Sequence, residues 1–322
     1  MTGILPSTSG VYHNSQPWRL AMPKAVTLPQ HFTQHGYWSA GSGKIYHGKY
    51  PDPASWQTYF PDQQKNKPND PLPAKRPVNG IPKTAHFDWG PVAQPPKAMG
   101  DYQVADWIIG QLKRDHDKPF FLACGIYRPH LPWYVPQKYF DLYQNNQKVP
   151  EHYIPYYAAI SQFDDTVGDL VNYVEGKGLA GNTLFVFVVD NGWTPSTRRH
   201  KIMKNFFHHT EESKRSPFED GLRTPILFRW DKRITPARHE LLCSSIDIAP
   251  TLLHIIGQSQ NAKALPGINL LDADARRRHA CARSGLRAEG RDDAARRERI
   301  PYVKVEEHVK FCLLYTSDAA DE

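Results

Sequence analysis

The sequence contains few cysteines and no long hydrophobic run. Its longest apolar runs, such as residues 184–189, are much shorter than the roughly 20 residues that cross a bilayer, so no membrane span is predicted. The four cysteines form no CxxC pair and no zinc spacing, so neither a disulfide framework nor a zinc site is predicted. The first twenty residues contain neither a basic stretch nor an apolar stretch, and no signal peptide is visible in them.

Apart from its prolines, the composition is that of an ordinary globular protein. Hydrophobic residues make up 40% and charged residues 23% of the 322 residues, enough for one large domain or two ordinary ones. Eleven of the 28 prolines lie between Pro51 and Pro96, which predicts one long surface excursion. The net charge of +7 suggests an acidic partner, either nucleic acid or a sulfated or carboxylated glycan.

Hydrophobic patterns predict alternating helices and strands. Segments with apolar residues on one helical face indicate amphipathic helices, and continuous apolar runs are typical of strands buried on both faces of a parallel sheet. The predicted helices are at 101–112, 156–175 and 246–256, and the predicted strands are at 119–127, 183–189 and 224–230. This order indicates an α/β fold.

The C-terminal segment has a different composition. Residues 273–299 contain nine arginines and five acidic residues and show no hydrophobic period. One interpretation is a solvated basic linker. We favour another, in which residues 273–322 are a frame-shifted or adapter-derived tail without a fold and residues 1–272 form the domain.

Asp190 and Asn191 follow a predicted buried strand. In open α/β sheets, ligands bind outside the carboxyl ends of the strands. A carboxylate beside an amide carbonyl supplies the oxygen ligands that Ca²⁺ or Mg²⁺ prefers. A strand-to-turn cap explains the same residues, and on their own they favour that simpler interpretation.

Four basic side chains lie in loops where a fixed cation could bind an anion. Lys214 precedes a predicted strand and could hold a tetrahedral anion. His130 lies between two prolines in RPHLPW, which restrict its backbone. Lys44 and His47, three apart in GSGKIYHG, could face one site. Each is also compatible with an ordinary surface or structural residue.

Together these segments resemble the sulfatases of the alkaline-phosphatase-like superfamily. GYWSAGSGKIYH at 36–47 is similar, position by position, to the second sulfatase signature. FFLACGIYRPHLPW, VVDNG, SKRSPFEDGLRTP and SSIDIAPTLLHIIG follow in the family's order. The resemblance covers roughly residues 1–272. RPHLPW and the opening TGILPSTSGVYHN look most like the iduronate-2-sulfatase-like branch.

The resemblance implies an α/β fold of the alkaline-phosphatase-like type, with a mixed, mostly parallel sheet sandwiched by helices and lacking its first strand near the centre. It implies one Ca²⁺, whose shell Asp190 and Asn191 would complete. Lys44 and His47 would hold and deprotonate the nucleophile. His130 and Lys214 would bind the sulfate oxygens.

The family's nucleophile is formylglycine, made from the cysteine of a Cys-x-Pro-Ser-Arg motif that is followed by Thr-Gly. Thr2 and Gly3 look like that Thr-Gly, so the resemblance implies that the cysteine lies shortly before Met1. The chain is therefore expected to be an N-terminally truncated sulfatase domain that lacks its nucleophile and is inactive as written.

Other functions stay open at this point. The alternatives are a phosphonate or phosphate monoester hydrolase of the same superfamily and a catalytically inert fragment. The expected partner is a sulfated small molecule or polysaccharide; nucleic acid is not expected, because charge alone suggests it.

A basic stretch is expected to help bind an anionic glycan unless it is merely solvated: Arg198, Arg199, His200, Lys201 and Lys204. The intact protein is expected to be periplasmic or secreted, and the sequence leaves the oligomeric state open.

Overall fold

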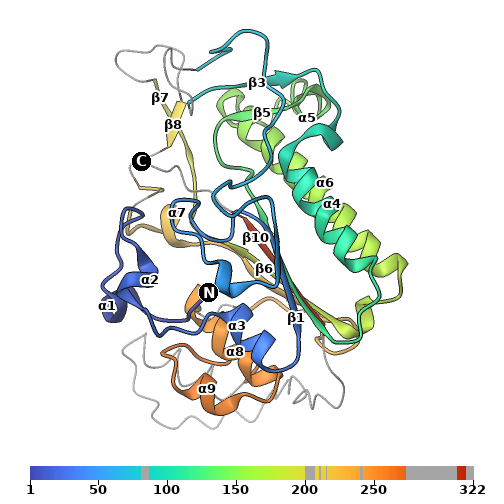
Figure 1. Ribbon diagram of the computed structural model, residues 1–322. Coiled ribbons are helices and arrows are strands. Elements are labelled where there is room, and N and C mark those ends of the chain that lie inside the picture. Colours follow the sequence, from blue (N-terminus) through green and yellow to red (C-terminus); the bar gives the residue numbers. More distant parts are fainter. Residues whose placement is uncertain are drawn as a thin grey trace, which may run out of the picture.

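A six-stranded sheet lies at the centre of the computed structural model, which describes residues 1–80, 87–199, 207–209, 212–214, 216–239, 242–272 and 310–316 (Figure 1). Its strand order is β2-β1-β4-β10-β6-β9. The strands are β1 (Trp38–Gly43), β2 (Thr58–Phe60), β4 (Phe120–Ile126), β6 (Thr183–Val189), β9 (Ile226–Arg229) and β10 (Lys310–Thr316). Every neighbouring pair is parallel except β6 and β9, which confirms the predicted mixed, mostly parallel sheet.

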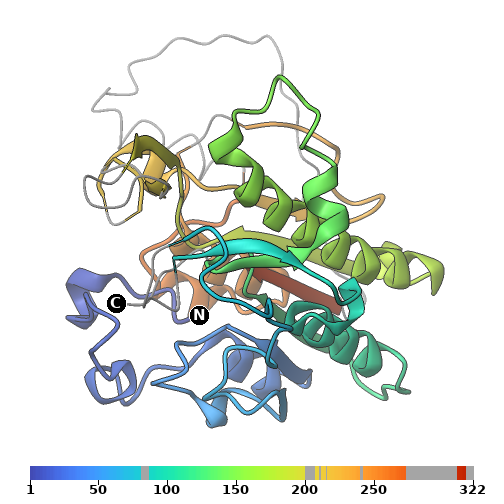
Figure 2. The same cartoon turned by 90° about the horizontal axis from the view of Figure 1, so that it is seen from above.

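Helices cover both faces of the sheet (Figure 2). One face packs against α4 (Gly100–Leu112) and α6 (Ile154–Gly176), and the other packs against α3 (Leu28–Gln34) and α8 (Ile248–Ile255). The predicted helices at 101–112, 156–175 and 246–256 are therefore confirmed. The remaining α-helices are short: α1 (Pro6–Ser9), α2 (Trp18–Ala21), α5 (Gln137–Asp141), α7 (Glu219–Leu222) and α9 (Ser259–Lys263).

Strand β4 shows why its sequence is apolar throughout. Phe120 and Leu122 pack in the cluster formed with α4 and α6, whereas Phe121 and Ala123 pack in the cluster formed with α3 and α8. Successive side chains of a strand point to opposite faces, so a strand covered on both sides needs an unbroken apolar run. All seven residues of β4 are buried.

The prediction that residues 273–322 have no fold is wrong for residues 310–316. These residues form β10, which pairs in parallel with β4 on one side and β6 on the other. It fills the central position of the sheet, where the first strand was expected. The sequence KFCLLYT is mostly apolar, as a central strand requires. The prediction rested on the arginine-rich composition of 273–299 and on the resemblance of the ending CLLYTSDAADE to translated adapter sequence. Residues 273–309 and 317–322 lie outside the described part of the chain.

The proline-rich excursion is confirmed as a largely irregular segment that contains β2 and β3 (Trp89–Val92). Strand β3 pairs with β5 (Trp133–Pro136), and a separate hairpin joins β7 (Pro195–Arg199) to β8 (Phe207–His209). The carboxylate of Asp88 links residues 78–80 of this segment to Tyr134 of β5. It accepts the backbone N–H groups of Val78, Asn79 and Gly80 and the hydroxyl of Tyr134.

Candidate functional site

The predicted site residues follow the carboxyl ends of three parallel strands. Lys44 follows β1, His130 lies in the loop after β4, and Asp190 follows β6. Strand β1 pairs directly with β4, and the backbone N–H of Lys44 donates to the carbonyl of Gly125 at 2.8 Å. Because parallel strands end at the same edge of a sheet, these three residues lie along one edge.

Glycines at the ends of β1 and β4 allow this close approach. Gly43 has a φ of +79°, and a Cβ there would lie 2.0 Å from the carbonyl oxygen of Gly125. A Cβ on Gly125 would lie 2.4 Å from the carbonyl oxygen of Lys44. The sequence GSGK therefore places Lys44 against the end of β4 in a way that a residue with a side chain would prevent.

The ring of Tyr127 lies between Lys44 and His130, and no sequence motif marked it as a site residue. The ammonium group of Lys44 lies 5.3 Å from the centre of the Tyr127 ring, within the range of a cation–π interaction. The imidazole ring of His130 lies 4.4 Å from the same ring. Lys44 and His130 are both buried. The contacts with Tyr127 therefore position the ammonium group of Lys44 and the imidazole ring of His130.

A buried ionic network supports the loop that carries Tyr127 and His130. The guanidinium of Arg128 lies 2.6 Å from the carboxylate of Asp70 and 3.6 Å from that of Asp101. Asp101 also accepts the backbone N–H groups of Tyr127 at 2.7 Å and Arg128 at 3.1 Å. The network therefore fixes both the side chain of Arg128 and the backbone at the start of the loop.

The charges in this network shift the pKa of Asp70. Burial alone would raise that pKa, but the nearby cations Arg128 and Lys67 outweigh it and lower the pKa to about 2. Lys67 lies 2.5 Å from the Asp70 carboxylate and 5.2 Å from the centre of the Tyr127 ring. Asp70 is therefore ionised at neutral pH and balances the buried guanidinium.

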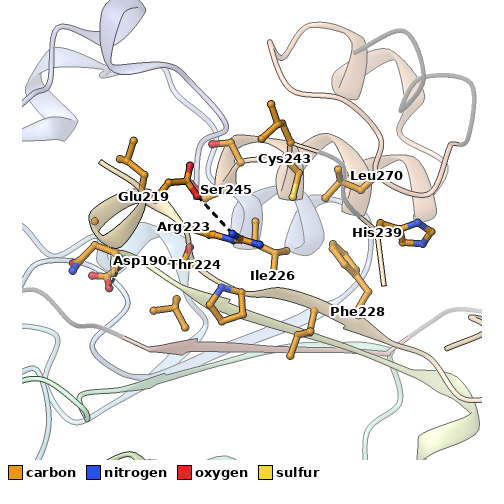
Figure 3. Close-up of a pocket in the computed structure, with 18 of the residues that line it drawn as sticks. Asp190, Glu219, Arg223, Thr224, Ile226, Phe228, His239, Cys243, Ser245 and Leu270 are labelled. Atoms are coloured by element: carbon orange, nitrogen blue, oxygen red, sulfur yellow. Dashed lines mark hydrogen bonds and ion pairs between the residues drawn. The ribbon is translucent and has the colours of Figure 1, made fainter. Parts of the chain in front are cut away.

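A cleft of about 2750 Å³ brings four of the six predicted site residues together: His47, Asp190, Asn191 and Lys214. Asp190, Glu219 and Arg223 lie at one end of the view in Figure 3, whereas Phe228, His239 and Leu270 lie toward the other. Polar and apolar side chains thus both line the cleft, and residues of β9 form part of its wall. Lys44 and His130 do not line this cleft; they lie buried beside Tyr127.

Two glycines hold the Lys214 segment against the end of β6. The backbone N–H of Gly192 donates to the carbonyl of Gly221 at 2.9 Å, and a Cβ on Gly192 would lie 2.1 Å from the carbonyl oxygen of Asp220. A Cβ on Gly221 would lie 2.0 Å from the carbonyl oxygen of Ser213. These contacts join segments far apart in sequence and place Lys214 in the same cleft as Asp190.

Asp190 and Asn191 offer suitable donors for a hard cation. The Asp190 carboxylate accepts the backbone N–H of Asn191 at 2.9 Å. The Asn191 amide nitrogen donates to the carbonyl of Gly192 at 2.9 Å. This bond uses the amide nitrogen, so the amide oxygen of Asn191 points away from Gly192. Ca²⁺ takes 6–8 oxygen ligands, so these two fit the ion but fill only part of its shell. Within the described residues, no group of three or more His, Cys, Asp and Glu side chains is placed to bind a metal.

The predicted basic stretch lies mostly outside the described residues. Arg198 and Arg199 belong to β7, whereas His200, Lys201 and Lys204 are not described. Within the described ranges, no helix is long and apolar enough to cross a membrane.

Solved structures share this fold. A structure from the glycosaminoglycan-metabolism locus of Bacteroides thetaiotaomicron has a TM-score of 0.57 and 22% sequence identity, and the match covers 84% of this chain and 61% of that one. Ps i-CgsB in complex with a neocarrahexaose has a TM-score of 0.57 at 18% identity, covering 84% and 62%. A protein from Vibrio parahaemolyticus described as in the alkaline phosphatase superfamily has a TM-score of 0.50 at 15% identity, covering 84% and 56%. The fold is therefore of the alkaline-phosphatase-like type.

The chain belongs to the Sulfatase family, whose model matches residues 1–258. A sulfatase of Formosa agariphila is 26% identical over 82% of this chain and 59% of its own length. An endo-4-O-sulfatase of Bacteroides thetaiotaomicron is 26% identical over 80% and 56%, and the iduronate 2-sulfatase of Homo sapiens is 23% identical over 71% and 49%. The chain thus spans about half to three-fifths of the length of these relatives.

Proposed function

We propose that the protein is a sulfuric ester hydrolase that removes sulfate from a sulfated glycan or a related sulfate ester. The observation that carries this proposal is the cleft that gathers His47, Asp190, Asn191 and Lys214 at the carboxyl end of the sheet. A sulfate ester is a fixed anion, so a site that binds it needs cations placed before the reaction. One relative is an N-acetylgalactosamine-6-O-sulfatase of Bacteroides thetaiotaomicron, and its name supports a sulfated sugar as substrate.

The residues of this chain take the following roles in the proposal. Lys214, which lines the cleft, binds sulfate oxygens and stabilises the negative charge that develops on the leaving alcohol. His130, which is buried beside Tyr127 and does not line the cleft, takes the same role on the basis of the family motif. Lys44 and His47 hold the nucleophile and accept its proton. Tyr127 keeps Lys44 and His130 in position through its ring.

Two further parts of the proposal come from the family resemblance. Asp190 and Asn191 would hold one Ca²⁺ together with ligands from elsewhere, and bound Ca²⁺ would neutralise sulfate oxygens. The nucleophile would be a formylglycine, and no Cys-x-Pro-Ser-Arg motif occurs in the 322 residues. A protein that acts on sulfated polysaccharides would work outside the cytoplasm, so we expect a periplasmic or secreted location.

Paired ligands test the proposal. Isothermal titration of the chain with inorganic sulfate and inorganic phosphate, in Ca²⁺-containing buffer, should show tighter binding of sulfate. Tighter binding of phosphate would instead favour a phosphate or phosphonate monoester hydrolase. Absence of binding to either anion would contradict both functions.

The nucleophile requires its own test. The protein isolated from its source organism should contain an aldehyde residue that reacts with a hydrazide probe and should hydrolyse sulfate esters. The 322-residue chain, which lacks the motif, should bind sulfate without hydrolysing the ester. Hydrolysis by the chain itself would contradict the proposed nucleophile.

A further inference from the structure

The aromatic ring of Tyr12 lies exposed at the wall of the cleft. Its side chain is 63% exposed, yet the residue lines the same cleft as His47, Asp190 and Lys214. The neighbouring residues 13–15 line this cleft as well. An exposed aromatic ring in the same cleft as these polar side chains offers an apolar face to a ligand.

The side chain of Gln16 bonds to the backbone that carries Tyr12. The side-chain oxygen of Gln16 accepts the backbone N–H groups of Tyr12 at 2.6 Å and His13 at 2.8 Å. Its side-chain nitrogen donates to the carbonyl of Gly10 at 3.0 Å. One glutamine therefore closes the loop formed by residues 10–16, which we name the Tyr12 loop.

The Tyr12 loop is also fastened to the segment that follows Lys44 and His47. The hydroxyl of Tyr50 donates to the carbonyl of Ser15 at 2.5 Å, and the indole N–H of Trp18 donates to the carbonyl of Tyr50 at 3.1 Å. Trp18 in turn stacks on Tyr46, with ring centres 5.5 Å apart and planes 11° apart. The loop and the predicted catalytic segment therefore form one connected unit.

We infer that Tyr12 is a binding surface for the sugar ring of a sulfated glycan whose sulfate lies at Lys214. This inference rests on the proposed function and adds a contact to the part of the substrate that does not react. A pyranose ring has an apolar face of C–H groups that can lie flat on an aromatic ring. Tyrosine has only two side-chain torsions, and the fixed loop lowers the entropy cost of binding further.

Isothermal titration with three sulfate esters tests the inference. Methyl sulfate has no sugar ring, whereas N-acetylgalactosamine 4-sulfate and a sulfated carrageenan hexasaccharide do. The wild-type chain should bind at least one sulfated sugar about five- to tenfold more tightly than methyl sulfate, as expected for one aromatic contact. Tyr12→Ala should remove this gain while changing the affinity for methyl sulfate less than twofold.

Matched variants separate the ring from the fold. Tyr12→Phe keeps the ring and should retain the gain, whereas Gln16→Ala releases the loop and should lose part of it. Leu142→Ala changes a side chain that is 60% exposed and does not line the cleft, so it should behave as wild type.

The outcomes distinguish this inference from the proposed function. If methyl sulfate binds but no sulfated sugar binds more tightly, or if Tyr12→Ala retains the gain, the inference is wrong and the proposed function stands. If neither methyl sulfate nor the sugars bind, both are wrong.

Discussion

The guanidinium of Arg128 lies 2.6 Å from the carboxylate of Asp70, a residue 58 positions earlier in the chain, and the Arg128 side chain is 1% exposed. This pair ties the proline-rich excursion to the loop that carries His130. Asp101 at the start of α4 completes the network by binding the same guanidinium and the backbone of that loop. The arrangement predicts that loss of Arg128 affects both stability and the site.

Arg128→Met should lower the free energy of unfolding by about 3–5 kcal/mol, because the buried Asp70 and Asp101 carboxylates lose the guanidinium between them and Asp70 keeps only its ion pair with Lys67. Urea denaturation followed by tryptophan fluorescence measures this change. Lys138→Met is the control: it removes an exposed ion pair with Asp165 and should cost at most about 1 kcal/mol. Equal losses in the two variants would contradict the role given to the network.

The pH dependence of stability should report on Asp70. Its pKa is about 2 in the folded protein, below its ordinary value of 3.8, so the unfolded chain takes up the proton first as the pH falls. The stabilisation is therefore complete above about pH 4 and is lost between about pH 4 and pH 2. Asp70→Asn should be less stable than wild type at pH 6, and the difference should shrink on acidification. A difference that does not change with pH would contradict this account.

Gly192→Ala should move the segment that carries Lys214 away from the end of β6, where Asp190 lies. The added methyl would lie 2.1 Å from the carbonyl oxygen of Asp220, so the segment that carries Lys214 must move away from Asp190. We expect weaker sulfate binding and a lower melting temperature by differential scanning calorimetry. Gly181→Ala is the matched control at the other end of β6, where a methyl would meet no atom within 4 Å. The account fails if Gly192→Ala binds sulfate as wild type does.

Asp190→Asn should weaken Ca²⁺ binding, because it replaces the charged carboxylate of the proposed ligand pair by a neutral amide. A Ca²⁺-dependent rise in melting temperature, compared with EDTA, measures the effect. Asp164→Asn, an exposed carboxylate on α6, should leave the rise unchanged. If Ca²⁺ raises the melting temperature of Asp190→Asn as much as that of the wild type, Asp190 is not a ligand of the metal.

The sequence predicted those parts of the fold that depend on local pattern. Unbroken apolar runs indicated the buried strands β4 and β6. A helical period of apolar residues indicated that α4 and α6 bury one face. The six site residues were found because family motifs mark them. The cleft brings four of the six together, which agrees with those motifs. Their chemical roles stay predictions.

The sequence did not predict contacts between distant segments. Arg128 in the motif RPHLPW was visible, but its partner Asp70 lies in an irregular segment without a period. Tyr127 and Tyr12 carry no charge pattern, so only their positions in space reveal their contacts. Strand β10 was missed because the composition of 273–299 indicated no fold and because the ending CLLYTSDAADE, which contains part of β10, resembles translated adapter sequence.

Sulfate binding by the chain and its Lys214→Ala variant tests the central claim most directly. Lys214 is 6% exposed in the cleft, so its loss removes a charge-assisted contact to sulfate, and affinity measured by isothermal titration should fall about tenfold or more. Lys177→Ala, at an exposed lysine just after α6, should bind sulfate as wild type does. Equal sulfate affinity in the wild-type chain and the Lys214→Ala variant would contradict the claim that this cleft is a sulfate site.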